Sequence, residues 1–301
     1  MNYNRLGKSG ILISEVSMGC MSLNIDEPEK AAKLIHTAID LGINFFDTAD
    51  LYDQGRNEAL VGTAINGKRE DVVIATKVGN QWNEKGTSWS WNPRKAYILS
   101  AVEESLKRLN TDYIDLYQLH GGTLEDPIEE IIETFEFLKE QGKIRSYGIS
   151  SIRPNVIREY IKRSNIDSVM MQYSLLDRRP EEVCLDLLGN HGISVITRGT
   201  LAKGLLAGKP AQPYLDHSTD QVKAASDAIK AVAHKMNQPE CATACQYVLQ
   251  SPAVASAVIG FRTLEQLLGC ITRGNNLTKL ETVDLKILQE STSAYIYESH
   301  R

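Results

Sequence analysis

The chain has 301 residues, of which 42% are hydrophobic and 24% are charged, as is ordinary for a globular protein with a large core. Its formal net charge of −5 argues against a general affinity for nucleic acid or for an anionic membrane. The first residues lack an apolar stretch long enough for a signal peptide, so we expect none, and no apolar run reaches the roughly 18 residues that a membrane span needs. We therefore expect a cytoplasmic protein folded as one domain over residues 1–301, without nucleic-acid or membrane partners; the oligomeric state is left open.

Short apolar segments alternate along the chain with longer segments of helical spacing. Ahead of them, Tyr3–Ser14 is typical of a β-hairpin around a Gly-Lys-Ser-Gly turn, which we expect to close one end of the fold. Continuous apolar runs rich in β-branched residues are typical of strands buried on both faces of a parallel sheet. The predicted strands are Glu15–Met21, Asn44–Thr48, Val72–Val78, Ile114–His120, Ile144–Ser150, Ser168–Tyr173, Ser194–Gly199 and Ala255–Gly260.

The segments between the strands place apolar residues three and four positions apart, which predicts amphipathic helices. Gly42, Gly142 and Gly192 each stand just past such a segment, where a left-handed cap ends a helix. The predicted helices are Glu29–Leu41, Glu58–Ile65, Tyr97–Leu109, Ile128–Gln141, Pro154–Arg163, Glu181–Asn190, Gln221–Lys235, Leu264–Arg273 and a terminal helix Val283–Tyr297.

This alternation predicts a closed parallel (β/α)8 barrel, or TIM barrel, with an N-terminal hairpin and an extra C-terminal helix. An open doubly wound sheet is the alternative. No GxGxxG follows the first predicted strand, where a dinucleotide-binding sheet of that kind needs one.

The five cysteines are odd in number, scattered, and free of any CxxC pair. This pattern predicts a reduced chain without a disulfide framework. Cys241 and Cys245 share a helix face, which we interpret as packing, and the six histidines form no ligand cluster. We therefore expect no metal site.

Polar residues gather at the ends of neighbouring predicted strands. Asp47 ends the second strand and Tyr52 follows it, Lys77 lies near the end of the third, and His120 ends the fourth. The carboxyl ends of barrel strands meet at one mouth, where such enzymes carry out their chemistry. Taken singly, Asp47 could cap a loop, Lys77 could be a surface charge and His120 could be a core residue.

Together these four groups predict a proton-delivery device. An ammonium beside a phenol stabilises the phenolate, so we expect Lys77 to lower the pKa of Tyr52. Asp47 would keep Lys77 charged, and His120 would orient a substrate oxygen. A phenol poised in this way suits carbonyl reduction by hydride, in which a developing alkoxide takes up a proton. A Schiff-base aldolase that uses Lys77 is the alternative chemistry.

Several stretches resemble the signature segments of the aldo-keto reductases, in the same order from the first strand to the last helix. They are Asn44–Tyr52 with Gly55, Asn57 and Glu58, then Ile74–Lys77, Asp112–His120 and Gly142–Ser150. Gly204–Lys209 resembles endings of the bacterial and potassium-channel-β-subunit-like branches. The resemblance implies an NADP(H)-dependent reductase of aldehydes or ketones, with Tyr52 as the acid. A protein that holds NADP(H) as a redox-sensing partner with slow or no turnover is the alternative.

The resemblance also implies a cofactor path along the strand ends. Its expected contacts are Gly19, Cys20, Met21 and Asp47, then Ser150, Ser151 and Gln172 at the carboxamide, then Arg198, Gly199, Thr200, Leu201, Lys203 and Lys209 at the ribose and diphosphate, and Gly260, Phe261, Arg262 and Gln266 at the 2′-phosphate and adenine. A glycine and a helix start that carries Arg262 independently suit a phosphate.

The chain departs from the family pattern at a few of these positions. Ser151 replaces a usual asparagine, Arg198 replaces an aromatic residue that stacks on the nicotinamide, and Gly269 and Cys270 replace a Glu-Asn pair. These departures affect contacts to the cofactor and leave the four catalytic groups intact.

All three tryptophans lie in the loop after the third predicted strand. Trp82, Trp89 and Trp91 are expected to form an aromatic wall of the substrate pocket. The alternative is a lid that packs on itself and does not contact the substrate.

Overall fold

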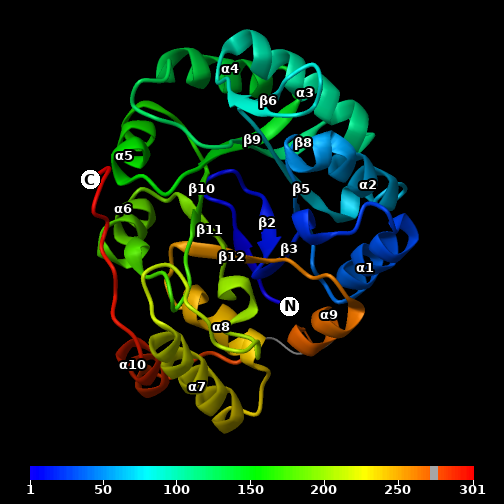
Figure 1. Ribbon diagram of the computed structural model, residues 1–301. Coiled ribbons are helices and arrows are strands. Elements are labelled where there is room, and N and C mark those ends of the chain that lie inside the picture. The colour runs from blue at the N-terminus through cyan, green and yellow to red at the C-terminus, as the bar shows by residue number, and fades with distance from the viewer. Residues whose placement is uncertain (272–276) are drawn as a thin grey trace.

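In the computed structural model, which describes residues 1–271 and 277–301, eight parallel strands close into a barrel surrounded by helices (Figure 1). The barrel strands are β3 (Val16–Gly19), β4 (Phe45–Asp47), β5 (Val73–Val78), β8 (Ile114–Leu119), β9 (Ile144–Ser150), β10 (Ser168–Gln172), β11 (Ser194–Arg198) and β12 (Val254–Ile259). All eight predicted strands are present, and the sheet closes where β12 pairs with β3. The TIM-barrel prediction is confirmed.

The helices form the outer layer, in which α10 packs on α7 and α9 packs on α1 and α8. They are α1 (Pro28–Asp40), α2 (Arg56–Ala64), α3 (Lys95–Leu109), α4 (Ile128–Glu140), α5 (Pro154–Arg163), α6 (Cys184–Asn190), α7 (Thr219–Lys235), α8 (Glu240–Leu249), α9 (Leu264–Cys270) and α10 (Thr282–Glu290). Among the described residues, no helix combines the length and apolar character that crossing a bilayer requires.

The helix predictions need correction at several places. Helix α8 was missing from the predicted helices, although Cys241 and Cys245 were placed on one helix face, because seven of its ten residues are buried and its sequence lacks a clear polar face. The predicted helix over Glu181–Asn190 is divided into a 3-10 turn, Arg179–Glu182, and α6. The terminal helix stops at Glu290 rather than Tyr297. Helix α9 ends at Cys270, and positions 272 and 273 of its predicted range lie outside the described residues.

The hairpin of β1 (Tyr3–Arg5) and β2 (Leu12–Ser14) contributes to the apolar filling of the barrel, as expected. Its Leu6, Ile11 and Ile13 share one buried cluster with residues of the strand interior. The strand members of that cluster include Phe45, Ala75, Leu116, Met170 and Ile196. Side chains alternate across a strand, so the residues two positions further along face the same interior. Those positions hold Asp47, Lys77, Gln118, Gln172 and Arg198, so polar groups lie above an apolar filling at the carboxyl end.

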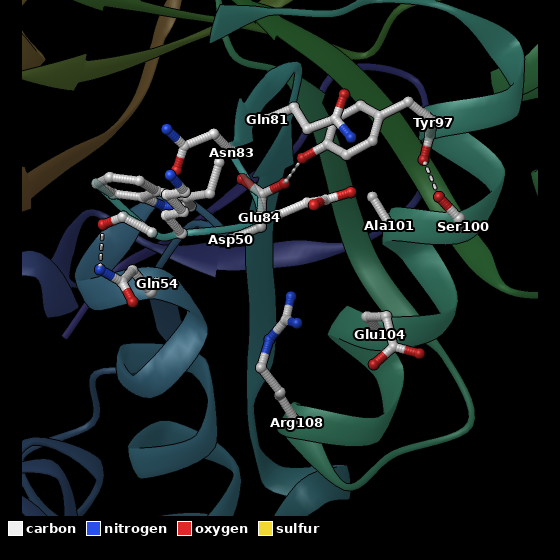
Figure 2. Close-up of a pocket in the computed structure, with 13 residues that line it drawn as sticks. Asp50, Gln54, Gln81, Asn83, Glu84, Tyr97, Ser100, Ala101, Glu104 and Arg108 are labelled. Carbon is white, nitrogen blue, oxygen red and sulfur yellow. Dashed lines mark hydrogen bonds between the residues drawn. The ribbon is translucent and has the colours of Figure 1, made fainter. Parts of the chain in front are cut away.

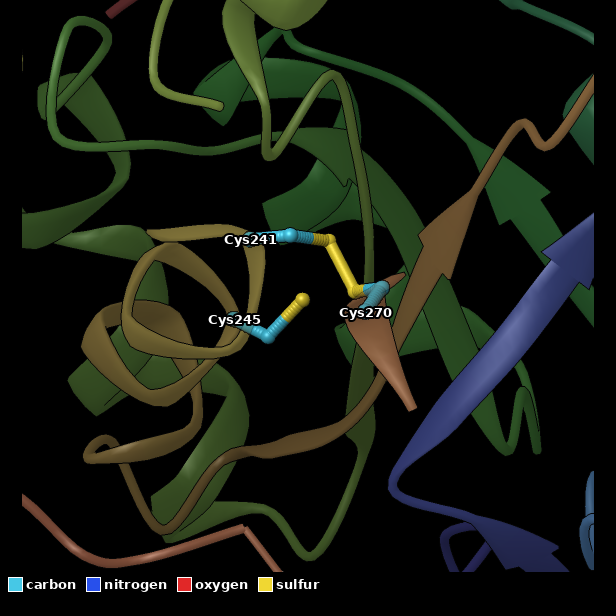
Figure 3. Close-up of side chains that lie close together, drawn as sticks. All are labelled: Cys241, Cys245 and Cys270. Carbon is cyan, nitrogen blue, oxygen red and sulfur yellow. A yellow bond between two sulfur atoms is a disulfide. The ribbon is translucent and has the colours of Figure 1, made fainter. Parts of the chain in front are cut away.

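The expectation of a chain without disulfides is wrong. Cys241 of α8 and Cys270 of α9 are joined by a disulfide, with their Cα atoms 5.3 Å apart (Figure 3). The two cysteines are 29 positions apart in the sequence, and only the packing of α8 against α9 brings them together. No spacing rule in the sequence could reveal this contact, because it depends on how two helices pack against each other.

Candidate active site

Lys77 is the centre of the polar groups at the barrel mouth. It is only 1% exposed, and its Nζ donates to Oδ2 of Asp47 at 2.7 Å and to the carbonyl of Thr48 at 2.6 Å. The third contact of Nζ is the hydroxyl of Tyr52, at 3.4 Å. An ammonium has three donors, and all three are directed at oxygen atoms here. Lys77 is therefore a fixed, buried charge rather than a surface lysine.

Tyr52 is positioned by an unusual turn. Asp53, Gln54 and Gly55 follow it with φ values of 49°, 58° and 82°, three successive residues in the left-handed region. A side chain on Gly55 would also collide with Arg108, since a Cβ there would lie 2.6 Å from the arginine Nε. At the third position of the turn only glycine fits, because it adopts this backbone conformation without strain and leaves room for Arg108.

His120 lies beside Tyr52, directly after the neighbouring strand β8. The rings of His120 and Tyr52 meet edge to face, with centroids 6.0 Å apart. Burial lowers the pKa of His120 to about 3, with Lys77 and Arg198 adding to the shift. The imidazole is therefore neutral, and its Nδ1 is buried without a hydrogen-bond partner among the described residues. A neutral imidazole suits hydrogen bonding to an uncharged oxygen.

The charge states agree with the sequence-based expectation for Lys77 and differ from it for Tyr52. Burial lowers the pKa of Lys77, but the neighbouring Asp47 carboxylate and Tyr52 raise it by more, so the amine stays charged. The pKa of Tyr52 is raised above its ordinary value, because burial of the phenolate outweighs the opposing attraction of Lys77. The expected lowering of this pKa is therefore wrong, and Tyr52 is held as a protonated phenol.

Gln118 is a residue of this site that the sequence did not single out. It pairs in register with Lys77 on the adjacent strand, is fully buried, and has no hydrogen-bond partner for either amide atom within the described part of the chain. Oδ1 of Asp47 is likewise buried without a partner among these residues. The only signal in the sequence for Gln118 was its position two residues before His120, which places both side chains on the same face of the strand.

A buried layer of hydrogen bonds supports the strand ends and loops around Lys77 and Tyr52. The Asn57 side chain accepts from the Thr48 hydroxyl at 2.7 Å and donates to the Cys20 carbonyl at 2.8 Å. Glu58 accepts from Thr76 at 2.5 Å and from Nε of Arg108 at 2.7 Å. Asn57 and Glu58 thus link the loops around Tyr52 and Lys77, which accounts for their place in the family-like segment.

The residues expected at the nicotinamide end lie side by side on β9, β10 and β11. Nη1 of Arg198 donates to the side-chain oxygen of Gln172 at 2.9 Å, and the Gln172 amide donates to Asp177 at 2.8 Å. Ser150 pairs with Met170 in register, and the Ser151 amide donates to the Met170 carbonyl at 3.0 Å. Arg198 is exposed, yet its positive charge acts to lower the pKa of both Tyr52 and His120.

The remaining expected cofactor contacts line the carboxyl ends of β3, β11 and β12. Cys20 is buried and Met21 is exposed just after Gly19. Beyond Gly199, which has a φ of 71°, Thr200 is buried, Leu201 and Lys203 follow, and Nζ of Lys209 donates back to the Lys203 carbonyl at 2.9 Å. After β12, Gly260 and the buried Phe261 lead to Arg262, whose amide donates to the Gln266 side chain at 2.9 Å.

Four cations stand along this rim: Arg198, Lys203, Lys209 and Arg262. Among residues 1–271 and 277–301, none of them forms an ion pair with a carboxylate. Unpaired cations on neighbouring strand ends form a local positive edge on a chain whose net charge is negative. Such an edge suits a ligand that carries several phosphates.

The three tryptophans lie on an unanticipated hairpin of β6 (Asn80–Trp82) and β7 (Trp89–Trp91). The Trp91 ring packs on Gly79 and on Gly121, directly after His120, and its Nε1 donates to Asp126 at 2.8 Å. Nε1 of Trp82 donates to the Leu51 carbonyl at 3.2 Å, whereas Trp89 is 53% exposed. Trp82 and Trp91 therefore brace the loops on either side of the mouth.

A separate pocket of about 440 Å³ lies behind the Tyr52 loop, between this hairpin and α3 (Figure 2). Asp50 is nearly buried in its wall and accepts from the Tyr97 hydroxyl at 3.2 Å. Burial and the charge of Glu58 raise the pKa of Asp50 to about 7. The lining of this pocket includes none of the groups Asp47, Tyr52, Lys77 and His120.

The chain is similar in sequence and in structure to known proteins. A sequence profile of the Aldo/keto reductase family matches residues 15–291. The chain is 52% identical over 310 aligned residues to the uncharacterized oxidoreductase YqkF of Bacillus subtilis, with both chains covered in full. It is 34% identical to the NADH-specific methylglyoxal reductase of Escherichia coli, over 70% of each chain. The holo form of aldo-keto reductase AKR11C1 from Bacillus halodurans superposes with a TM-score of 0.93 at 47% identity, covering 100% of this chain and 99% of the other.

Proposed function

Because the chain belongs to the aldo/keto reductase family, whose members are oxidoreductases, we propose that it reduces aldehydes or ketones with NADPH and that Tyr52 delivers the proton. One observation carries this proposal. The buried ammonium of Lys77 contacts both Asp47 and the Tyr52 hydroxyl at the end of the barrel where strand termini meet. The neutral ring of His120 lies beside Tyr52 and is the fourth member of this group.

The residues divide the work of proton delivery among them. Tyr52, held protonated, donates to the substrate oxygen as negative charge develops on it. Lys77 then stabilises the phenolate left behind, since its charge is maintained by Asp47. His120 donates a second hydrogen bond to the same oxygen and fixes its orientation. The nicotinamide, when bound, supplies the hydride.

The residues at the mouth fit a dinucleotide cofactor. Gln172 and Ser151 offer polar groups at the nicotinamide end, and the unpaired Arg198, Lys203 and Lys209 offer charge for the diphosphate. Arg262 presents a guanidinium suited to a phosphate monoester, which supports NADPH over NADH. The Escherichia coli relative carries NADH specificity in its name, so the preference has to be measured for this chain.

The substrate side of the proposal rests on the β6–β7 hairpin. Trp91 packs beside the residue that follows His120, and Trp82 holds the loop that leads into Tyr52. We assign these two rings to the wall of a pocket for carbonyl compounds with an apolar substituent. The more exposed Trp89 would be an outer edge of the same wall.

The Schiff-base alternative for Lys77 has little support, because an amine that Asp47 keeps charged is not a nucleophile. We also propose that Gly204–Lys209 is similar to the matching segment of the potassium-channel-β-subunit-like branch. That branch suggests the second possibility, an NADP(H)-binding redox sensor with slow turnover.

The test is to mix the purified protein with NADPH, or with NADH, and a reactive aldehyde while following nicotinamide absorbance. We expect aldehyde-dependent oxidation of NADPH, faster than that of NADH at equal low concentrations. Tight NADPH binding without turnover across a panel of aldehydes and ketones would favour the redox-sensing protein instead. Borohydride trapping of a substrate on Lys77 would favour the aldolase.

A further inference from the structure

Three cysteines meet where α8 packs against α9 (Figure 3). Cys241 and Cys245 lie one turn apart on α8, and Cys270 ends α9. Their sulfur atoms all lie within 4.8 Å of one another, and Cys241 is bonded to Cys270. The proposed reaction at Tyr52 uses none of these groups, so the cluster calls for a separate explanation.

The disulfide fixes one end of a helix whose other end belongs to the cofactor rim. Helix α9 has seven residues, and Thr263 caps its start by accepting from the Gln266 amide at 3.2 Å. The Gln266 side chain in turn accepts from the Arg262 amide at 2.9 Å. A helix this short has little stability of its own, so its contacts and covalent links determine its order. The bond from Cys270 to Cys241 is one such link.

We propose that Cys241 and Cys270 form a reducible clasp, a site of thiol–disulfide exchange with dithiol reductants, whose state sets the affinity of the α9 end for the cofactor. This inference rests on the proposed function for the role of Arg262 and Gln266. The clasped form holds these residues in place before the cofactor arrives, and the reduced form must order them on binding. Preorganisation of this kind raises affinity without adding a contact.

The exchange begins at Cys241, which is half-buried, whereas Cys270 is buried. A thiolate of the dithiol attacks Sγ of Cys241, the Cys241–Cys270 bond breaks, and the Cys270 sulfur leaves with the electron pair and takes up a proton. The second thiol of the reductant then attacks the reductant's other sulfur, the one bonded to Cys241, and releases Cys241 as a thiol. The dithiol ends as a disulfide, and the protein gains two thiols.

Cys245 provides an internal control. Its sulfur is close enough to both partners to exchange with them, but it is fully buried, and this burial raises the pKa of its thiol to about 12. The thiolate is the attacking species, so Cys245 remains a bystander near neutral pH. Replacing it changes the volume and polarity of the same cluster while leaving the clasp intact.

The experiment measures NADPH affinity and α9 order in both redox states of the same protein. Oxidised and dithiothreitol-reduced wild type are titrated with NADPH by fluorescence, and peptide mass mapping verifies the Cys241–Cys270 link. Amide hydrogen exchange of residues 264–270 is followed in parallel without cofactor. Cys270→Ser and Cys241→Ser lack the clasp, and Cys245→Ser keeps it.

We expect reduction to raise the Kd for NADPH about three- to tenfold, as ordering one or two side chains implies, and to speed exchange in α9. Cys270→Ser and Cys241→Ser should show the reduced behaviour with or without dithiothreitol, and Cys245→Ser should respond as wild type does. Equal Kd values in the two states, with or without a change in exchange, would overturn the inference. Binding of neither NADPH nor NADH in either state would instead refute the proposed function.

Discussion

The Nζ of Lys77 lies 3.4 Å from the Tyr52 hydroxyl, yet the pKa of Tyr52 stays above its ordinary value. Burial of the phenolate outweighs the attraction of the ammonium at this site. Under the proposed function, the Tyr52 phenol is thus kept as an acid, and the charge of Lys77 becomes useful only once the proton has left.

This relationship predicts the pH dependence of reduction. Tyr52 must be protonated to act, and its raised pKa keeps it so throughout the neutral range. His120, whose pKa is about 3, does not titrate there either. We expect kcat for aldehyde reduction to be flat between about pH 6 and 9 and to fall only above about pH 10. A loss of kcat with a midpoint near neutrality would show that Lys77 lowers the Tyr52 pKa after all.

Arg262 should set the choice between NADPH and NADH. A charge-assisted contact to the 2′-phosphate is worth on the order of 1.5–3 kcal/mol, or about 10–100-fold in affinity. Arg262→Ala should remove most of this preference and leave the Kd for NADH unchanged. Lys209→Ala is the matched control, because it should weaken both cofactors alike through the diphosphate they share. Titrations that find equal NADPH and NADH affinities for the wild type would contradict this assignment.

Arg198 should distinguish the two redox forms of the cofactor. If its guanidinium stacks on the nicotinamide, it repels the positive ring of NADP⁺ by about 4 kcal/mol at ~4 Å and an effective dielectric of ~20. Asp47 and the cofactor phosphates offset part of this repulsion, so we expect about a tenfold preference for NADPH.

Arg198→Tyr should abolish that preference, whereas Arg198→Lys should retain much of it because the charge is kept. Titration of both redox forms against each protein provides the measurement. If the ratio of the two affinities is the same in Arg198→Tyr and wild type, Arg198 binds Gln172 or a phosphate instead of stacking.

Asp50 should make the fold less stable as the pH rises. Its carboxyl pKa is raised from 3.8 to about 7, so the folded state holds this proton more tightly than the unfolded state does. The free energy of unfolding should therefore fall between about pH 4 and 7, by up to about 4 kcal/mol. Below this window the full stability is present, and above it the loss is complete.

Asp50→Asn should remove this part of the pH dependence, and Asp53→Asn, which alters an exposed carboxylate of the same loop, should not. Urea unfolding at several pH values compares the two variants with wild type. An unchanged slope in Asp50→Asn would show that Asp50 is charged in the fold at neutral pH.

The sequence was informative where strand order alone determines proximity. Asp47, Lys77 and His120 lie at or just past the carboxyl ends of three neighbouring barrel strands, and these ends converge, so their meeting could be predicted. Gln118 was overlooked because a glutamine within a strand has no distinctive pattern. The Cys241–Cys270 contact depends on helix packing, and the direction of the Tyr52 pKa depends on the depth of burial. Neither helix packing nor depth of burial can be read from the spacing of residues along the sequence.

The most direct test of the account is single-turnover reduction of an aldehyde by NADPH-loaded Tyr52→Phe. General acid catalysis is typically worth ~10²–10⁴-fold, roughly 3–5 kcal/mol, so hydride transfer should slow by that factor while the Kd for NADPH stays close to that of wild type. Tyr97→Phe is the matched control, because that hydroxyl binds Asp50 in the neighbouring pocket and should be dispensable for turnover. If Tyr52→Phe transfers hydride within a factor of about two of wild type, Tyr52 is not the proton donor and the proposed mechanism is wrong.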